Sequence, residues 1–487
     1  MKQRSLGVNT ALNGIKTLLT ILFPVMTFWR VCRIFSVDTV GSYTFANAAA
    51  GYFLMFSALG IATYAVREGV AFREDPERMS AFASEVFTLN LISAAVVYLI
   101  LGVFVTVWPR FAACRELLLI LSVNMALTAL GCDWLHTVYE DFLYVTLRTI
   151  GVYALALILF FLLVRTPDDL YTYAWITVLA SAGAQLLNIP ARRKYGVSVR
   201  PVRPETARRH LKPVLTLFAN TVTTSIYVNS DTLILGFLRS DYEVGLYSVA
   251  VKIYTLFKTL LSAVITAVTP RLSALWAAGD PEAFEKNASR IFQALLTLLA
   301  PVAVGLFFLG KQLILIIADA PYLSGLAAVR WLCAALVLSL VGWFVTACVL
   351  IPAKKDKEVL RITVIAAAEN ILLNLLLIPF FGFTAAAVTT VLAEGTACVL
   401  GLREAGKLIR IRSLVSGRTV LSILAGSAVI AAVCLWAHTW AAGPVAQTLG
   451  AFAISVPLYG AAVLLLKNPA AEDLLERLKN LGITKSK

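Results

Sequence analysis

Apolar stretches long enough to cross a lipid bilayer recur along almost the whole chain. About fourteen can be drawn, and they are continuous runs without the alternation of apolar and polar residues typical of barrel strands. Hydrophobic residues make up 59% of the 487 residues and charged residues only 14%, against roughly 25% in soluble proteins. The sequence therefore predicts an all-α polytopic membrane protein with about 14 transmembrane helices.

The boundaries of the expected spans are set to within several residues. A short amphipathic helix at the membrane surface is expected over 469–482. The basic N-terminus has an apolar run interrupted by Lys16 and no A-x-A site, which favours a first span over a removable signal. The expected spans are 7–31, 40–66, 84–108, 115–137, 143–164, 170–190, 211–238, 243–268, 288–312, 324–351, 359–380, 383–402, 417–437 and 445–466.

Basic residues outnumber acidic ones by 42 to 28, which gives a net charge of +14. They concentrate in loops between spans, above all in 191–212, where they are expected to set topology and contact anionic lipids. No nucleic-acid-binding motif accompanies them, so nucleic acid is not expected as a partner. The positive-inside rule predicts that both termini and all even-numbered connections are cytoplasmic.

Motifs for metal, disulfide or nucleotide chemistry are not recognised. The seven cysteines are scattered and never form CxxC, which indicates neither a disulfide framework nor a metal site. GLFFLGKQ at 305–312 resembles a phosphate-binding loop, but Gln312 stands where Ser or Thr must reach magnesium. We expect no cofactor and no enzymatic activity.

An internal repeat suggests two halves. VGSY at 40–43 recurs as VGLY at 244–247, and a basic residue, Arg67 or Arg271, follows each tyrosine by 24 residues. Because each half has six spans, the halves have the same orientation, and substrate is expected between them. The expected organisation is a six-helix bundle (1–195), a basic cytoplasmic linker (196–212), a second six-helix bundle (213–412), and two further transmembrane helices with an amphipathic cytoplasmic tail (413–487).

Polar residues follow one face of the seventh expected span. Asn220, Thr224, Tyr227 and Asp231 are spaced by four, three and four residues, which places them together on a helix. A charged carboxylate facing lipid costs about 2.5–3.5 kcal/mol on insertion scales, so this face is expected to meet protein or water. The next span carries Lys252 and Lys258 in an apolar run. Hydrogen bonding between packed helices is one interpretation, and a solute pathway is the one we favour.

The first expected span carries a similar stripe, consisting of Asn9, Asn13, Lys16, Thr20, Thr27 and Arg30. Lys16 and Arg30 are expected to face one cavity, although Arg30 could also snorkel to the outer interface. Glu369 and Glu394 are candidates for proton or cation coupling, and each could equally neutralise a buried lysine or arginine. Other intramembrane polar residues are Asp133, His136, Arg330, Asn370 and Asn374.

Several segments, in this order, resemble the bacterial polysaccharide repeat-unit flippases of the multidrug/oligosaccharidyl-lipid/polysaccharide (MOP) exporter superfamily. The resemblance covers nearly the whole chain, with departures at Ala191 and Thr384. The segments are GSYTFANAAAGYFLMFSALGIATYAVREG (41–69), DWLHTVYEDFLYVTLRTI (133–150), DDLYTYAWITVLASAG (168–183), NIPARRKY (188–195), YVNSDTLILGFLRSDYEVGLYSVAVKI (227–253), TPRLS (269–273) and NILLNLLLIPFFGFTAAAVTTVLAE (370–394).

This resemblance implies two six-helix bundles in a V around a central cavity, with two additional helices. It also implies a function, which is to move a polyprenyl-pyrophosphate-linked oligosaccharide across the membrane by alternating access. Such a substrate, membrane lipids and polysaccharide polymerase machinery are the implied partners.

Candidate roles in that cavity follow from the chemistry of the substrate. Lys16, Arg30, Lys252 and Lys258 would bind the pyrophosphate, and Asp231 would balance charge or couple to an ion gradient. Arg67, Glu68 and Arg271 would gate or orient. The expected hydrogen-bonding partners of the sugar hydroxyls are Asn9, Asn13, Thr20, Asn220, Thr224 and Tyr227.

Three alternatives remain open. A cation-coupled multidrug antiporter of the same superfamily would need an acidic, aromatic cavity, whereas the candidates here are four cations and one acid. A peptidoglycan lipid-precursor flippase shares the fold and the lipid-pyrophosphate headgroup. A membrane-embedded glycosyl transferase or polymerase would need a large external loop with catalytic carboxylates, and the expected external loops are short.

Overall fold

The computed structural model describes residues 20, 23–473 and 475, with only the backbone for 219–229. This described part is mainly helical and holds no strand. Ten of its helical segments are long and apolar enough to cross a membrane. The chain is thus an all-α polytopic membrane protein, which confirms the predicted fold class.

Several expected spans do not correspond one to one with these ten segments, and each is located as follows. α16 (Asp356–Ala405) contains the two spans expected at 359–380 and 383–402, joined at Gly382, whose φ of 57° is non-helical. α6 (Arg115–Gly131) and α12 (Leu211–Leu238) match the fourth and seventh spans. A helix over 23–34 continues the first expected span, most of which lies outside the described residues.

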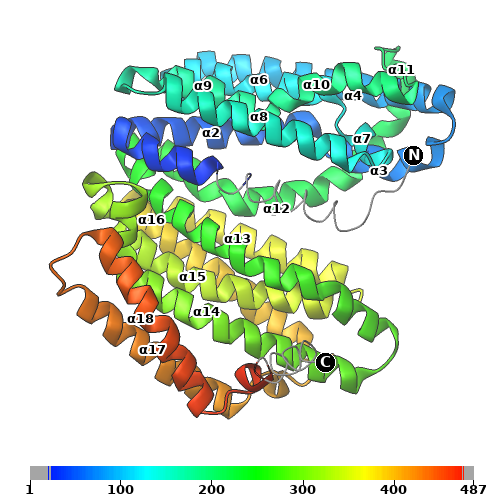
Figure 1. The fold of residues 1–487 in the computed structure, drawn as a ribbon. Coiled ribbons are helices and arrows are strands. Elements are labelled where there is room, and N and C mark those ends of the chain that lie inside the picture. Colours follow the sequence, from blue (N-terminus) through cyan, green and yellow to red (C-terminus); the bar gives the residue numbers. More distant parts are fainter. Residues whose placement is uncertain (1–19, 21–22, 474, 476–487) are drawn as a thin grey trace, which may run out of the picture. The chain divides into compact units, whose positions relative to one another are not determined.

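The chain divides into two compact units, Met1–Gly245 and Leu246–Lys487. The expected boundaries of the bundles and linker stay predictions. In the first unit, α2 packs against α4 and α6, and α6 packs against α9 and α10 (Figure 1). Its helices after 23–34 are α2 (Val37–Ala58), α3 (Ile61–Gly69), α4 (Pro76–Val107), α5 (Pro109–Ala113), α6, α7 (Trp134–Val138), α8 (Phe142–Leu163), α9 (Leu170–Val178), α10 (Ala184–Ala191), α11 (Pro204–Ala207) and α12.

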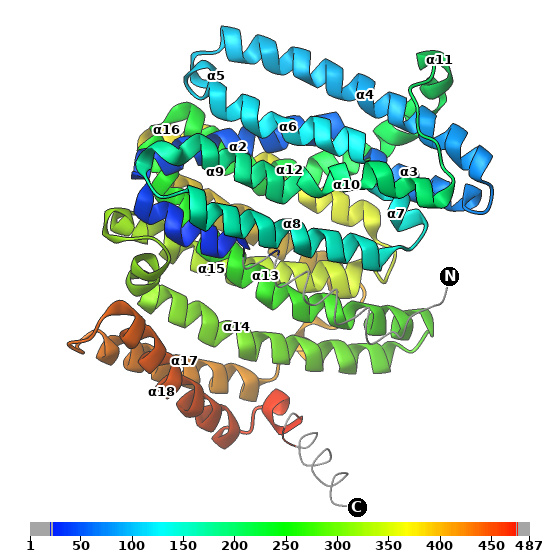
Figure 2. The same cartoon turned by 45° about the horizontal axis from the view of Figure 1, so that its top comes forward.

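In the second unit, α15 packs against both α14 and α16, and α17 and α18 form a pair that packs on α14 (Figure 2). Apolar side chains including Leu309, Ile430 and Tyr459 fill the interface between α14 and this pair. The unit is built from α13 (Asp241–Ala277, which begins in the first unit), α14 (Pro281–Ile317), α15 (Leu326–Val345), α16, α17 (Gly417–Ala437) and α18 (Pro444–Leu465).

Helix starts follow the local sequence. Ser36 caps α2 by accepting a hydrogen bond from the amide of Thr39. Asp75 caps α4, and Asp280 caps α14, in each case with a proline as the first helical residue. These side chains accept bonds from amides that have no partner within the helix, and proline suits the first helical position.

The expected basic linker is an ordered strap along α4. The amides of Ser198, Arg200 and Val202 donate to the hydroxyls of Ser80, Ser84 and Thr88, at 3.0, 3.2 and 2.9 Å. Two extended residues advance by about 6.6 Å and four helical residues by about 6 Å, so the two repeats stay in register. The segment that follows leads directly into α12.

Candidate functional site

The stripe on the first expected span is described only in part. Asn9, Asn13 and Lys16 lie outside the described residues, and Thr20 is half-buried. Thr27 is buried and donates to the carbonyl of Phe23, a structural role.

Arg30 is half-buried on the helix over 23–34. Its guanidinium carbon lies 5.3 Å from the centroid of the Phe161 ring. Its Nε atom is buried and has no hydrogen-bond partner among the described residues. A buried donor left unpaired is costly, so this side chain suits an acceptor that arrives from outside the described residues.

The polar face expected on α12 is placed by its backbone. Asn220, Thr224 and Tyr227 lie on this helix, but their side chains are outside the described part of the structure. Asp231 is 9% exposed, next to the buried Ser230. It interacts electrostatically with Tyr52 of α2. Asp231 therefore faces protein, as the cost of exposing a carboxylate to lipid requires.

Lys258 is held by a carboxylate and a phenol in the second unit. Its Nζ lies 3.1 Å from Glu394 Oε1 of α16 and donates to the Tyr254 hydroxyl at 2.9 Å. The Tyr254 hydroxyl donates in turn to the same carboxylate oxygen at 3.2 Å. The Lys258 side chain is 33% exposed and that of Glu394 is 10% exposed. Of the two roles considered for Glu394, neutralising a buried lysine is the one seen here.

Lys252 is also half-buried on α13. It precedes Lys258 by six residues, so at 3.6 residues per turn the two lysines leave the helix on different faces. The second candidate carboxylate, Glu369 of α16, is half-buried and has no hydrogen bond or ion pair within the described part of the chain. Of the two candidate carboxylates, Glu369 is thus the one that no described lysine or arginine neutralises.

A buried polar network links the two arms of α16. Asn374 donates to Asn370 Oδ1 at 3.0 Å, and Thr389 donates to Asn374 Oδ1. All three side chains are at most 2% exposed. These residues satisfy one another across the bend at Gly382, which favours a structural role.

The residues expected to gate lie at exposed positions. Arg67 Nε donates to Glu68 Oε1 at 3.0 Å, and both side chains are about half exposed. Arg271 is exposed near the C-terminal end of α13. An exposed pair of neighbours contributes little to stability, so these charges are free to exchange partners.

An intramembrane ion pair was missed in the sequence. Arg148 of α8 has a side chain that is 4% exposed and pairs with Asp133. It also donates to Asn188 Oδ1 and to the Ala184 carbonyl on α10. Arg148 interrupts the apolar run 142–164, and an arginine there, with Asp133 upstream, was a usable signal.

Next to this pair, Asp141 accepts hydrogen bonds from the segment that follows α10. Lys194 Nζ and the Tyr195 hydroxyl donate to Asp141 Oδ2 at 2.9 and 2.7 Å. Burial opposes ionisation of this carboxyl, but the bonds from Lys194 and Tyr195 prevail and hold its pKa below the ordinary value of 3.8. His136 is buried at 1% exposure, and its Nδ1 bonds the Tyr195 hydroxyl at 2.9 Å.

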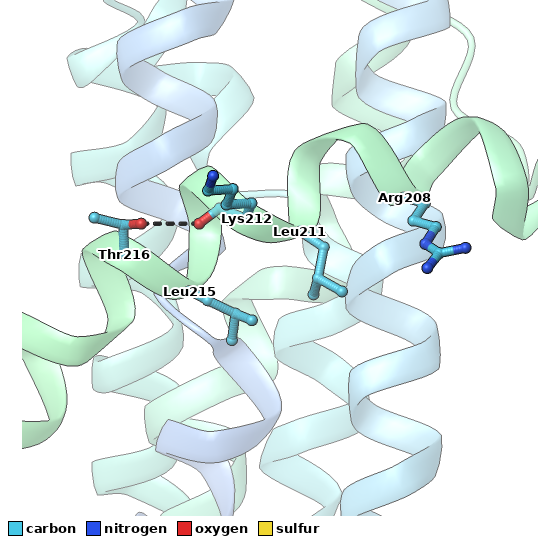
Figure 3. A pocket seen from close by; sticks show the side chains of 5 residues that line it. All are labelled: Arg208, Leu211, Lys212, Leu215 and Thr216. Carbon is cyan, nitrogen blue, oxygen red and sulfur yellow. Dashed lines mark hydrogen bonds between the residues drawn. The ribbon is translucent and has the colours of Figure 1, made fainter.

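An open groove of about 460 Å³ lies at the start of α12, lined by Arg208, Leu211, Lys212, Leu215 and Thr216. Figure 3 shows the two leucines pointing to one side, while Arg208 and Lys212 extend apart from each other. Thr216 donates to the Lys212 carbonyl at 3.0 Å. None of the expected substrate-binding residues lines this groove. Among the described residues, no group of three or more His, Cys, Asp or Glu side chains could hold a metal ion.

Comparison with known proteins identifies matching families and similar proteins. Residues 6–276, more than half of the chain, match the family described as "Polysaccharide biosynthesis protein", and residues 217–380 match MatE. The chain is 25% identical over 368 residues to "Putative O-antigen transporter" of Shigella dysenteriae, covering 74% of this chain and 90% of that protein. It is 30% identical over 182 residues to "Probable flippase AglR" of Haloferax volcanii, covering 37% and 38%.

Solved structures share the fold at low identity. The lipid II flippase MurJ, in an inward closed conformation, aligns with a TM-score of 0.74 at 16% identity, covering 96% of this chain and all 100% of that chain. An inward-facing multidrug resistance MATE family transporter of the MOP superfamily aligns with a TM-score of 0.61 at 14% identity, covering 82% and 95%. The class that the fold defines is a multi-pass α-helical membrane protein with the fold shared by these two transporters.

Within that class, the sequence match decides the family. The chain belongs to the polysaccharide biosynthesis protein family. The predicted family is thereby confirmed. The named relatives are transporters and flippases.

Proposed function

We propose that this protein moves a polyprenyl-pyrophosphate-linked oligosaccharide repeat unit across a bacterial cytoplasmic membrane, by alternating access, for surface polysaccharide synthesis. The O-antigen transporters among the relatives support this substrate class. The headgroup carries a pyrophosphate and sugar hydroxyls, which need cations and hydrogen-bond partners within the membrane. Its lipid tail needs neither and can stay in the bilayer.

The unpaired Nε of Arg30 carries the proposal. A guanidinium presents Nε and Nη donors in a planar fork that matches two oxygens of a phosphate. The Phe161 ring, 5.3 Å from the guanidinium carbon, stabilises the Arg30 cation without occupying its Nε donor. A pyrophosphate oxygen would supply the acceptor that the described residues lack.

Lys258 takes part by exchanging partners. Glu394 pairs with the Lys258 ammonium, and a pyrophosphate would compete for the same Nζ. Exchange of one anion for another keeps the lysine charge compensated throughout, which limits the desolvation cost. Lys16 and Lys252 would supply further positive charge.

The remaining residues have supporting roles in this proposal. Glu369 and Asp231 are the candidates for ion coupling, since both are carboxylates within spans. Glu394 could join them when Lys258 leaves it. Arg67, Glu68 and Arg271 would gate or orient, and the sugar would be held by Asn9, Asn13, Thr20, Asn220, Thr224 and Tyr227.

The topology belongs to the proposal as well. The positive-inside rule, applied to the basic loop 191–212 and the other positively charged connections, supports a cytoplasmic location for both termini. Substrate would then be loaded from the cytoplasmic leaflet and delivered to the polymerase machinery on the outer side. Labelling of single cysteines in alternate connections would test this orientation.

The deciding experiment is deletion of the gene, followed by analysis of the lipid-linked oligosaccharide that accumulates in the cytoplasmic leaflet. An accumulating repeat unit of a surface polysaccharide supports the proposal, and an accumulating peptidoglycan precursor would favour that alternative. Accumulation of neither, with increased sensitivity to cationic drugs, would favour the antiporter.

Complementation then tests the residues. Lys16→Ala, Arg30→Ala and Lys252→Ala should insert normally and fail to restore surface polysaccharide. Arg418→Ala, an exposed arginine at the start of α17, is the matched control and should restore it. Normal polymer from the Lys16, Arg30 and Lys252 variants would refute their assigned roles.

A further inference from the structure

An intramembrane arginine with no role in the proposed transport lies in a groove between α14 and α15. The groove measures about 610 Å³, and Arg330 is its only charged lining residue. The guanidinium carbon of Arg330 lies 5.4 Å from the centroid of the Phe307 ring, and the side chain is exposed. No ion pair or hydrogen bond from the described residues reaches it. The other lining residues are apolar, among them Val304, Phe308, Trp331 and Val337.

The arginine lies toward one end of this groove. α14 ends at Ile317 and α15 begins at Leu326, so the connection between them marks the membrane surface. Arg330 lies four residues into α15, about 6 Å from its start, and Val337 lies about 10 Å deeper. The cation therefore sits nearer the surface, and the apolar walls continue toward the bilayer centre.

A second cation flanks the same end. Lys311 follows Phe307 by four residues on α14, which places it one turn nearer the connection on the same face. It is exposed and forms no ion pair with a described carboxylate. Phe307 and Trp331, which line the groove, are 42% and 45% exposed. A lipid-facing groove with a cationic mouth and aromatic walls matches the amphipathic shape of a phospholipid.

We propose that this groove binds an anionic phospholipid. The phosphate accepts hydrogen bonds from Arg330, and an acyl chain lies along Phe307, Val304 and Val337. Charge complementarity selects the anionic class, because the groove offers no carboxylate to an ammonium headgroup. Snorkelling of Arg330 to water, stabilised by the Phe307 ring, is the competing explanation. It predicts no preference for the lipid headgroup.

Trp331 provides the readout. The full chain is reconstituted in vesicles of zwitterionic phosphatidylcholine with increasing fractions of brominated phosphatidylglycerol, or of brominated phosphatidylcholine for comparison. Bromine quenches nearby tryptophan fluorescence, and the Trp331 signal is the difference between the parent protein and Trp331→Phe. Half-quenching is expected at roughly a fivefold lower mole fraction of phosphatidylglycerol than of phosphatidylcholine.

Three variants test whether Arg330 is the cause of the headgroup preference. Arg330→Gln should abolish the headgroup preference, and Arg330→Lys should keep part of it. Arg165→Gln, an exposed arginine at the end of α8, should leave it unchanged. Equal quenching by both lipids in the parent protein, or a preference that persists in Arg330→Gln, would overturn the proposal. The measurement involves no transport, so its outcome is separate from that of the proposed function.

Discussion

Gly41 and Gly245 pack backbone against backbone near the starts of α2 and α13. A Cβ atom on Gly41 would lie 2.8 Å from the amide nitrogen of Gly245, and one on Gly245 would lie 2.8 Å from Val37 Cγ1. They are the glycines of the two VGxY motifs. Small residues allow helix backbones to approach closely within a membrane, so this contact requires glycine at both positions.

Gly41→Ala should therefore destabilise the protein. The added methyl group would meet the backbone of α13, which cannot yield as a flexible side chain does, and overpacking of this kind costs about 1–3 kcal/mol. The shift in melting temperature is measured by heating the protein in detergent and monitoring the folded fraction by size-exclusion chromatography. Gly51→Ala on the same helix meets no atom within 4 Å and is the control. Equal melting of the two variants would contradict the close contact.

Variants of the Lys258–Glu394 pair distinguish an effect on stability from an effect on transport. Lys258→Ala leaves a mostly buried carboxylate without its partner, which should cost roughly 1–3 kcal/mol, less than in a fully buried pair because Lys258 is 33% exposed. The double variant Lys258→Ala, Glu394→Gln should recover stability without recovering surface polysaccharide. Melting temperature and polymer production are measured in parallel. Transport by the double variant would remove Lys258 from the proposed site.

The acid stability of the first unit should depend on Asp141. Its pKa is lower in the folded protein than the ordinary 3.8, so ionisation favours folding. This contribution is present above about pH 4 and is lost as pH falls through the folded pKa. Asp141→Asn should thus melt below the parent protein at neutral pH, and the gap should narrow as the pH falls below about 4. Asp168→Asn, at an exposed turn, serves as control. A gap independent of pH would refute the linkage.

The strap along α4 should be loosened by removing its acceptors. Ser84→Ala with Thr88→Val deletes the hydroxyls that accept from the amides of Arg200 and Val202. Each such bond contributes about 0.5–1.5 kcal/mol, so the exchange of these amides should quicken roughly two- to tenfold. Hydrogen exchange read by mass spectrometry measures it. Ser93→Ala, whose hydroxyl bonds Phe56 on α2 instead, should leave the strap unchanged.

Sequence reasoning was most successful where signals are local. Long apolar runs predicted the membrane helices, and glycine with φ of 57° at position 382 separates two spans that were expected separately. The sequence was least informative about which charged side chains pair with each other. Arg148 was not singled out, although it visibly interrupts the apolar run 142–164. Its partners Asp133, Ala184 and Asn188 are brought together only by the packing of α8 and α10.

The sequence by itself determined that this chain spans a membrane many times and to which family it belongs, because apolar length and segment order are properties of the linear chain. Tertiary structure alone decided which charges are compensated. Glu394 and Lys258 are 136 residues apart, and two carboxylates, Glu369 and Glu394, looked equivalent in the sequence. Only one of them meets a lysine among the described residues, because helix packing brings α13 against the second arm of α16.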